Sequence, residues 1–180
     1  HFVSLTGRML LLDDVTDDIV SVSTGLTLRK VWRHTVRDYF PQHHGKYEGE
    51  WHIAVGKEVD CESWWYKRIW AMVGLGYAFD KGGAPWIRAE VDYDYLLCNQ
   101  FVLTLLAKGH FGLGKHDLDK CEEIEWNRIR YRNTDVGLKV TFIADNFATL
   151  SLEYTRRVWA INSPENVDAL ELVFMYPFGL

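Results

Sequence analysis

Charged residues occupy every second position of the segment 88–95, and apolar or aromatic residues occupy the positions between them. An extended strand places alternate side chains on opposite faces, so this segment predicts a strand with one charged and one apolar face. The charged face would carry Arg88, Glu90, Asp92 and Asp94. What the chain does therefore depends on which of the two faces points into the fold.

The same period of two recurs along the chain and predicts about ten strands with almost no helix. Turn-forming residues at 80–83, 133–135 and 145–146 suit antiparallel hairpins, so the strands are expected to form an up-and-down meander. The segment 96–107 is apolar on both alternating sets and predicts either a strand buried on both faces or a short helix. The predicted strands cover residues 2–12, 19–32, 47–57, 64–79, 85–96, 100–111, 122–132, 135–144, 147–160 and 168–178.

A meander of this length is expected to close, because long open sheet edges invite aggregation. The fold class expected for the 180 residues is therefore all-β, a single domain made of one antiparallel up-and-down β-barrel of about eight to ten strands. The chain begins at His1 in a strand-like pattern without Met, so a leader or a longer upstream region is expected outside it.

The barrel could face either way. In a soluble lipocalin-like barrel the apolar set points inward, whereas in a transmembrane barrel it faces lipid and the charges line the lumen. Three features favour the transmembrane version. Many predicted strands are about ten residues long, their polar sets mix small residues with opposed charges, and aromatic residues gather near strand ends. Those aromatic residues are Trp64, Trp65, Tyr66, Tyr93, Tyr95, Tyr154, Trp159, Tyr176 and Phe178.

Composition excludes some functions. The formal charge of −5 and the pI near 5.8 argue against a nucleic-acid partner, because acids outnumber the scattered Lys and Arg. No run of about eighteen apolar residues is present, so no helical membrane span is expected. Cys61, Cys98 and Cys121 lack the spacing of a zinc site, and the first and last either bridge in an oxidising compartment or remain reduced.

The C-terminal segment 171–178 is amphipathic, with aromatic residues at alternate positions from Phe174. In this ending, and in its alternation throughout, the chain resembles the outer-membrane β-barrel proteins of Gram-negative bacteria, whose last strand is read by the assembly machinery. The ending departs from their pattern in having Val173 where glycine is common, Pro177 inside the signal, and no aromatic residue at the terminus. The resemblance implies an outer-membrane location.

The connection 32–46 is long and basic. If the last of ten strands ends in the periplasm, counting the strands backwards places this connection on the periplasmic side. Turns on that side are normally short. Either the count is wrong by one, or the loop has a role there. Its residues could contact anionic sugars or phosphates, the alternative being an ordinary exposed loop. They are Arg33, His34, Arg37, His43 and His44.

The predicted inward charges form the main candidate site. Paired carboxylates can divide acid and base roles, but the same groups can form a ladder of salt bridges that fills a small polar lumen. Catalysis would need a His or Ser placed against them, and the salt-bridge ladder is the favoured reading. The predicted lumen charge cluster is Arg68, Arg88, Glu90, Asp92, Asp94 and Glu153.

Two acidic regions could hold a divalent ion. The segment 110–123 lacks the glycine and the distal glutamate of a calcium loop, and the acidic segment 13–18 is read as an exposed hairpin tip. No metal site, cofactor or catalytic residue is therefore assigned.

The sequence predicts an integral outer-membrane β-barrel with a charged, largely plugged lumen. Its role would be structural, transport-associated or surface-binding, and a non-enzymatic role is favoured. The expected partners are the lipid bilayer with lipopolysaccharide and other envelope proteins. The alternatives are a soluble lipocalin-like barrel that binds an apolar ligand and an outer-membrane hydrolase or lipid-modifying enzyme.

Overall fold

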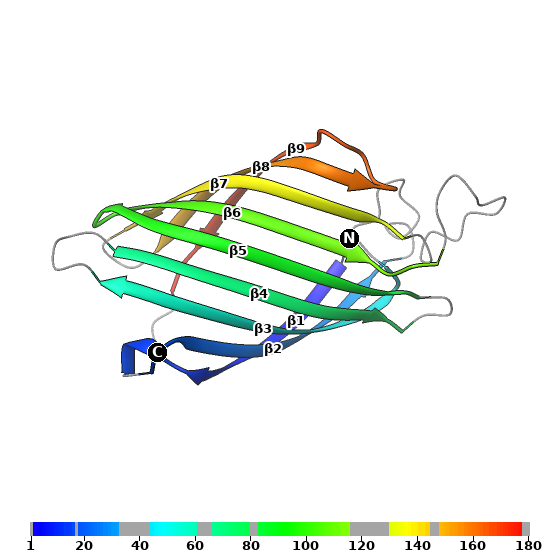
Figure 1. Ribbon diagram of the computed structural model, residues 1–180, viewed down its shortest axis with the longest axis horizontal. Coiled ribbons are helices and arrows are strands. Elements are labelled where there is room, and N and C mark those ends of the chain that lie inside the picture. Colours follow the sequence, from blue (N-terminus) through cyan, green and yellow to red (C-terminus); the bar gives the residue numbers. More distant parts are fainter. Residues whose placement is uncertain are drawn as a thin grey trace.

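The computed structural model describes residues 2–16, 18–32, 44–60, 66–79, 83–115, 130–144 and 148–177. In these ranges nine strands form one sheet, and each pairs antiparallel with its neighbour in sequence. The predicted all-β, up-and-down antiparallel meander is confirmed (Figure 1). The elements are β1 (Phe2–Leu12), the 3₁₀ helix η1 (Asp14–Thr16), β2 (Ser21–Val31), β3 (Tyr47–Asp60), β4 (Tyr66–Ala78), β5 (Pro85–Cys98), β6 (Phe101–Gly112), β7 (Arg132–Ile143), β8 (Thr149–Ile161) and β9 (Asp168–Met175).

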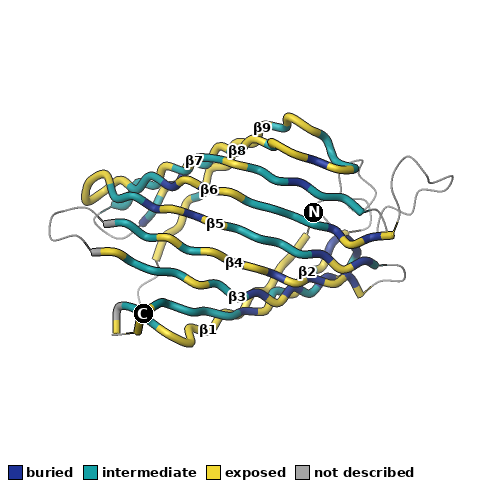
Figure 2. Tube along the Cα trace, in the orientation of Figure 1, coloured by how far each residue is buried: buried dark blue, intermediate teal, exposed yellow. Residues whose placement is uncertain are grey.

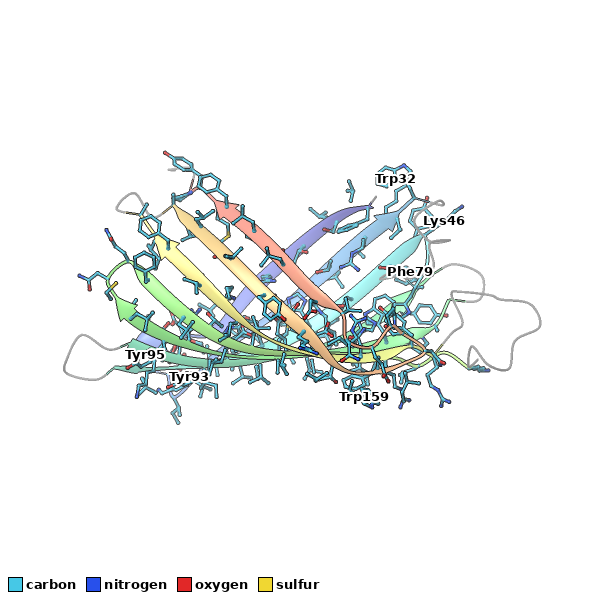
Figure 3. All side chains as sticks on the ribbon, turned by 90° about the horizontal axis from the view of Figure 1, so that it is seen from above. Trp32, Lys46, Phe79, Tyr93, Tyr95 and Trp159 are labelled. Atoms are coloured by element: carbon cyan, nitrogen blue, oxygen red, sulfur yellow. The ribbon has the colours of Figure 1, made fainter. Side chains whose placement is uncertain are left out.

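The sheet is strongly curved but does not close. β1 and β9 are its two edges, and within the described residues they do not pair with each other. Seen from above, the strands form a trough, and β1 and β9 lie on the two sides of its opening (Figure 3). The structure is therefore an open, curved sheet.

Each strand has an apolar and a polar face, as the period of two predicts. In β4, Val73, Leu75 and Tyr77 are exposed, whereas Gly74 and Gly76 between them are buried. The same alternation of exposed and buried positions runs along the central strands in Figure 2. The polar face lies on the concave side of the sheet, because its ion pairs reach across an intervening strand. The charged set of β5 lies on this inner face, and Val91 and Tyr93 lie on the outer face.

Two local predictions are wrong, and a third lies mostly outside the described residues. The turn predicted at 133–135 lies inside β7, since Asn133, Thr134 and Asp135 pair with β6. The segment 96–107 is neither a helix nor buried on both faces, because it contains the β5–β6 hairpin turn at residues 99–100. The strand predicted at 122–132 lies mostly outside the described residues, and its described end joins β7 only at Arg132.

The strand count places the connections. β2, β4, β6 and β8 all finish at one end of the sheet, here called the long-connection end, which the segments 32–46, 79–84, 113–131 and 162–167 join. β9 finishes at the opposite end, here called the short-turn end (Figure 1). The connection 32–46 therefore lies opposite the end of β9, and the predicted conflict came from counting one strand too many.

No helix among the described residues is long and apolar enough to cross a membrane.

Candidate functional site

The inner face carries ion pairs that pass over one intervening strand. Arg88 of β5 contacts Glu50 of β3 across β4, with 2.7 Å between Nη2 and Oε1. Lys139 of β7 lies across β6 from Asp92 of β5, with 3.5 Å between Nζ and Oδ2. Such contacts need a concave surface, because side chains from alternate strands converge only where the sheet curves toward them. Lys108 of β6 contacts Glu153 of β8 in the same way.

A second set of contacts joins neighbouring strands. Arg68 donates from Nε and Nη2 to Oδ2 of Asp94, at 3.0 and 2.8 Å. Thr104 donates to the other carboxylate oxygen of Asp94 at 2.6 Å. Asp94 is almost fully buried, so these contacts offset the loss of water around its charge. The Asp94 carboxylate is therefore held in one position and accepts hydrogen bonds at both oxygens.

All six residues of the predicted charge cluster lie on this inner face, and each has an oppositely charged neighbour. Glu90 lies 3.8 Å from Lys108, measured between Oε1 and Nζ. Asp92 is only 1% exposed, and its carboxylate accepts no hydrogen bond from the described residues. No described His or Ser hydrogen-bonds to Glu90, Asp92 or Asp94. The arrangement is that of a charge ladder.

An aromatic stack covers the inner face near the long-connection end. The ring centroids of His44 and Trp86 lie 4.4 Å apart, and those of His44 and His110 lie 5.0 Å apart. Tyr131 stacks on His110 with a centroid separation of 5.0 Å. The Nε2 atoms of the two histidines are 2.8 Å apart, so one ring donates a proton and the other accepts it.

Ionised groups hold this stack in place. The backbone N–H groups of His44 and Gly45 donate to Oε1 of Glu48 at 2.5 and 3.1 Å. Arg29 donates to the other oxygen of Glu48 at 3.0 Å. The Trp86 indole N–H donates to Oε2 of Glu50 at 3.1 Å. The stack and the charge ladder thus share Glu50. Burial raises the pKa of Tyr131 to about 12, so this ring is neutral at ordinary pH.

Two glycines of β4 make room for these groups. A Cβ at Gly76 would lie 1.9 Å from Cε2 of Trp86, closer than any real contact. A Cβ at Gly74 would lie 3.1 Å from the carboxylate end of Glu50, a contact that a small shift relieves. The indole of Trp86 therefore lies directly against the backbone of β4.

The remaining inner surface borders a hollow of about 710 Å³ toward the short-turn end. Its lining comes from every strand between β1 and β9 and is mostly polar or small. Charged side chains in that lining include Arg8, Arg68, Lys139, Glu153 and Glu171. Because the sheet is open, the hollow is open between its two edge strands.

The outer face carries aromatic residues toward both ends of the strands. Trp32, Phe79 and Trp159 lie at the long-connection end, and Tyr93 and Tyr95 lie at the other (Figure 3). The surface between them is made of exposed Val, Leu and Ile side chains, such as those at 73, 75 and 91. The outer face is therefore an apolar band with aromatic residues at both margins.

Of the five residues predicted for the long loop, the structure describes only one. The structure places His44 inside the stack, where it is 3% exposed. Arg33, His34, Arg37 and His43 lie outside the described residues. So do Cys61 and Cys121, whereas Cys98 is a free, exposed thiol. Within the described ranges, no group of three or more His, Cys, Asp or Glu side chains could hold a metal ion.

The sequence reasoning missed several inner residues. Glu48, Glu50 and His52 alternate with exposed Tyr47 and Trp51, so the period of two could have identified them as inward. Extending the same alternation back from Arg88 adds Trp86, and tracing it through β6 adds His110. Tyr131 follows no alternation, because it precedes β7, and nothing in the sequence could have placed it beside His110.

No family model, no curated protein and no solved structure matches the chain.

Proposed function

We propose that this chain forms the wall of a β-barrel in the outer membrane of a Gram-negative bacterium. One observation carries the proposal: apolar side chains cover the outer face of the sheet, while the charges lie paired on the inner face. Exposing so many large apolar groups on one continuous surface is unfavourable in water, whereas the same surface is compatible with contact to lipid.

The dimensions support a membrane span. In β4 the outward apolar set runs from Ile69 to Tyr77, eight residue steps of about 3.3 Å, or about 26 Å along the strand. A strand tilt of about 40° reduces this to about 20 Å along the membrane normal, near the apolar band of about 25 Å in outer-membrane barrels. The aromatic margins fit the two membrane interfaces.

The inner face supports a non-enzymatic role. The ion pairs and the aromatic stack occupy the space that a wide channel would need, so the barrel would pass only small solutes, if any. Its role is structural, transport-associated or surface-binding, with the bilayer and envelope components as its surroundings. A soluble carrier of an apolar ligand would need an apolar inner face, and a hydrolase would need a His or Ser on the inner acids.

The test is a pair of arginine substitutions on the outer face. Val91 lies at the middle of β5, and Val59 lies near the short-turn end of β3. In a bilayer, Val91→Arg is expected to destabilise the folded chain by about 2–4 kcal/mol and Val59→Arg by about 0–1 kcal/mol, because the cost of a charge depends on depth.

The measurement is denaturant unfolding of chains refolded into lipid vesicles, followed by tryptophan fluorescence. Heat-modifiable migration on a gel and extraction only by detergent are expected for the unaltered chain. Equal effects of the two arginines, or full solubility without detergent, would overturn the proposal.

A further inference from the structure

The two edges of the sheet run in the same direction. Because nine strands alternate in direction, β1 and β9 both run from the long-connection end to the short-turn end. Direct closure would therefore join them as a parallel pair in an otherwise antiparallel sheet. One further strand, antiparallel to both, would remove both edges and give the even strand number usual for single-chain outer-membrane barrels.

Exposure shows that both edges lack a neighbour in the described sheet. The outward side chains of Leu5 in β1 and Leu170 in β9 are 74% and 72% exposed. Leu138, outward on the central strand β7, is only 46% exposed, because strands on both sides cover part of it. The edge residues thus lack the cover that one adjacent strand provides.

Two inner-face charges that are unpaired among the described residues indicate how many strands would fit between β9 and β1. Arg8 of β1 and Glu171 of β9 both line the inner hollow. Neither forms an ion pair with a described residue, although the inner charges of β3 and β5 to β8 pair over one intervening strand. With one strand inserted between β9 and β1, Glu171 and Arg8 would likewise be separated by one intervening strand.

The strand under the ion pair between Glu50 and Arg88 has small inward residues, whereas β6 under the contact between Asp92 and Lys139 has Leu106. The first of these contacts is the shorter one. Beneath the contact between Glu50 and Arg88, β4 has Gly74 and Gly76 on its inner face. A strand between β9 and β1 with small inward residues would likewise let the two charges approach to the shorter distance.

We propose that the gap between β1 and β9 binds one extended polypeptide strand from outside the described sheet. The strand runs antiparallel to both edges, is about ten residues long, carries apolar side chains outward and small side chains inward, and lies beneath an ion pair between Arg8 and Glu171. The inference rests on the proposed barrel, whose wall this strand completes.

The test uses the full 180-residue chain refolded in detergent micelles, with its three cysteines replaced by serine. Leu5→Cys and Leu172→Cys then provide one thiol on the outer face of each edge. The probe is a synthetic peptide of about ten residues, alternating outward leucine and valine with inward glycine and threonine, with one outward cysteine. The control peptide is identical except for inward tryptophans.

Both thiols are expected to capture the small-residue peptide about tenfold more than the control, since bulky inward groups block the ion pair. Arg8→Glu should reduce capture about threefold, and adding Glu171→Arg should restore it. A disulfide between positions 5 and 172 within one chain would overturn the proposal in favour of direct parallel closure. A disulfide between two chains would overturn it in favour of a second copy.

Equal capture of the two peptides, or no capture, would also overturn it. The failure of this inference is distinguishable from failure of the barrel proposal. A chain that keeps heat-modifiable migration and the Val91→Arg effect but captures no peptide remains a membrane protein without this strand. A chain that is soluble without detergent would contradict both the barrel proposal and the proposed strand.

Discussion

A methyl group at position 76 is predicted to displace Trp86 and to open the aromatic stack. The added Cβ of Gly76→Ala would lie 1.9 Å from the indole ring, 1.5 Å short of an ordinary contact at 3.4 Å. The ring cannot move away freely, because it is 2% exposed, stacks on His44 and donates a hydrogen bond to Glu50. Gly74→Ala, two residues away on the same face, is the matched control.

The expected destabilisation has two parts. Overpacking of a close-packed site costs about 1–3 kcal/mol, and loss of a hydrogen bond to a charged group costs about 1.5–3 kcal/mol. Movement of the ring partly relieves the overpacking, but it breaks the hydrogen bond to Glu50. The expected loss in the free energy of unfolding for Gly76→Ala is therefore about 3 kcal/mol, less than the two maximal costs added together. At Gly74 the nearest atoms are those of Glu50 at 3.1 Å, so a shift of a few tenths of an ångström relieves the contact and alanine there should change stability by less than about 1 kcal/mol.

Equilibrium unfolding in detergent micelles, followed by tryptophan fluorescence across a guanidinium titration, measures both variants. The double variant Gly76→Ala/Trp86→Leu should lose less stability than the sum of the two single variants, because the smaller side chain no longer meets the methyl group. Equal unfolding midpoints for the two alanine variants would refute the reasoning. So would a Gly76→Ala variant as stable as the unaltered chain.

Three further predictions concern the inner face and the β1–β2 turn. Asp94→Asn should lower the free energy of unfolding by about 2 kcal/mol, and Asp92→Asn by about 1 kcal/mol or less, because only Asp94 has close donors; denaturant titration compares them, and equal losses would contradict this. His110→Phe should cost about 1 kcal/mol by removing the bond between the histidines, and His110→Ala about 3 kcal/mol by also emptying the stack. The backbone N–H of Glu58 and the hydroxyl of Ser21 lower the pKa of Asp14 below 3.8, so its stabilisation of the turn is present above that pH and is lost as pH falls through the lowered pKa. A carboxyl NMR titration checks this, and Asp14→Asn should remove the pH dependence of the turn.

The sequence determined the faces of the strands but not their partners. The alternation from Arg88 to Tyr95 was enough to predict which side chains share a face, because the pleat of a strand has a period of two. Which charges meet depends on register and curvature, and these do not appear in a local pattern. The contact between Lys139 and Asp92 joins strands that are not adjacent, so no spacing along the chain predicts it.

Errors came where polarity and structure disagree locally. Asn133, Thr134 and Asp135 have the composition of a turn, yet pairing with β6 holds them in β7, since a polar inner face accepts such residues within a strand. The predicted strands 85–96 and 100–111 leave a break beside the turn at 99–100, but the apolar residues on both sides also suggested a buried strand or a short helix across it. A polar turn signal is reliable only when the strand interior is apolar.

The ion pairs that pass over an intervening strand have a consequence for the order of folding. Glu50, Asp92 and Lys108 each pair with a charge two strands further along the sheet, so these three contacts form only when that later strand has docked. A sheet interrupted between the two strands of such a pair lacks that contact, so growth there should be cooperative over three strands at a time. A truncated sheet is then expected to lose more stability than the hydrogen bonds of its missing strand alone would supply.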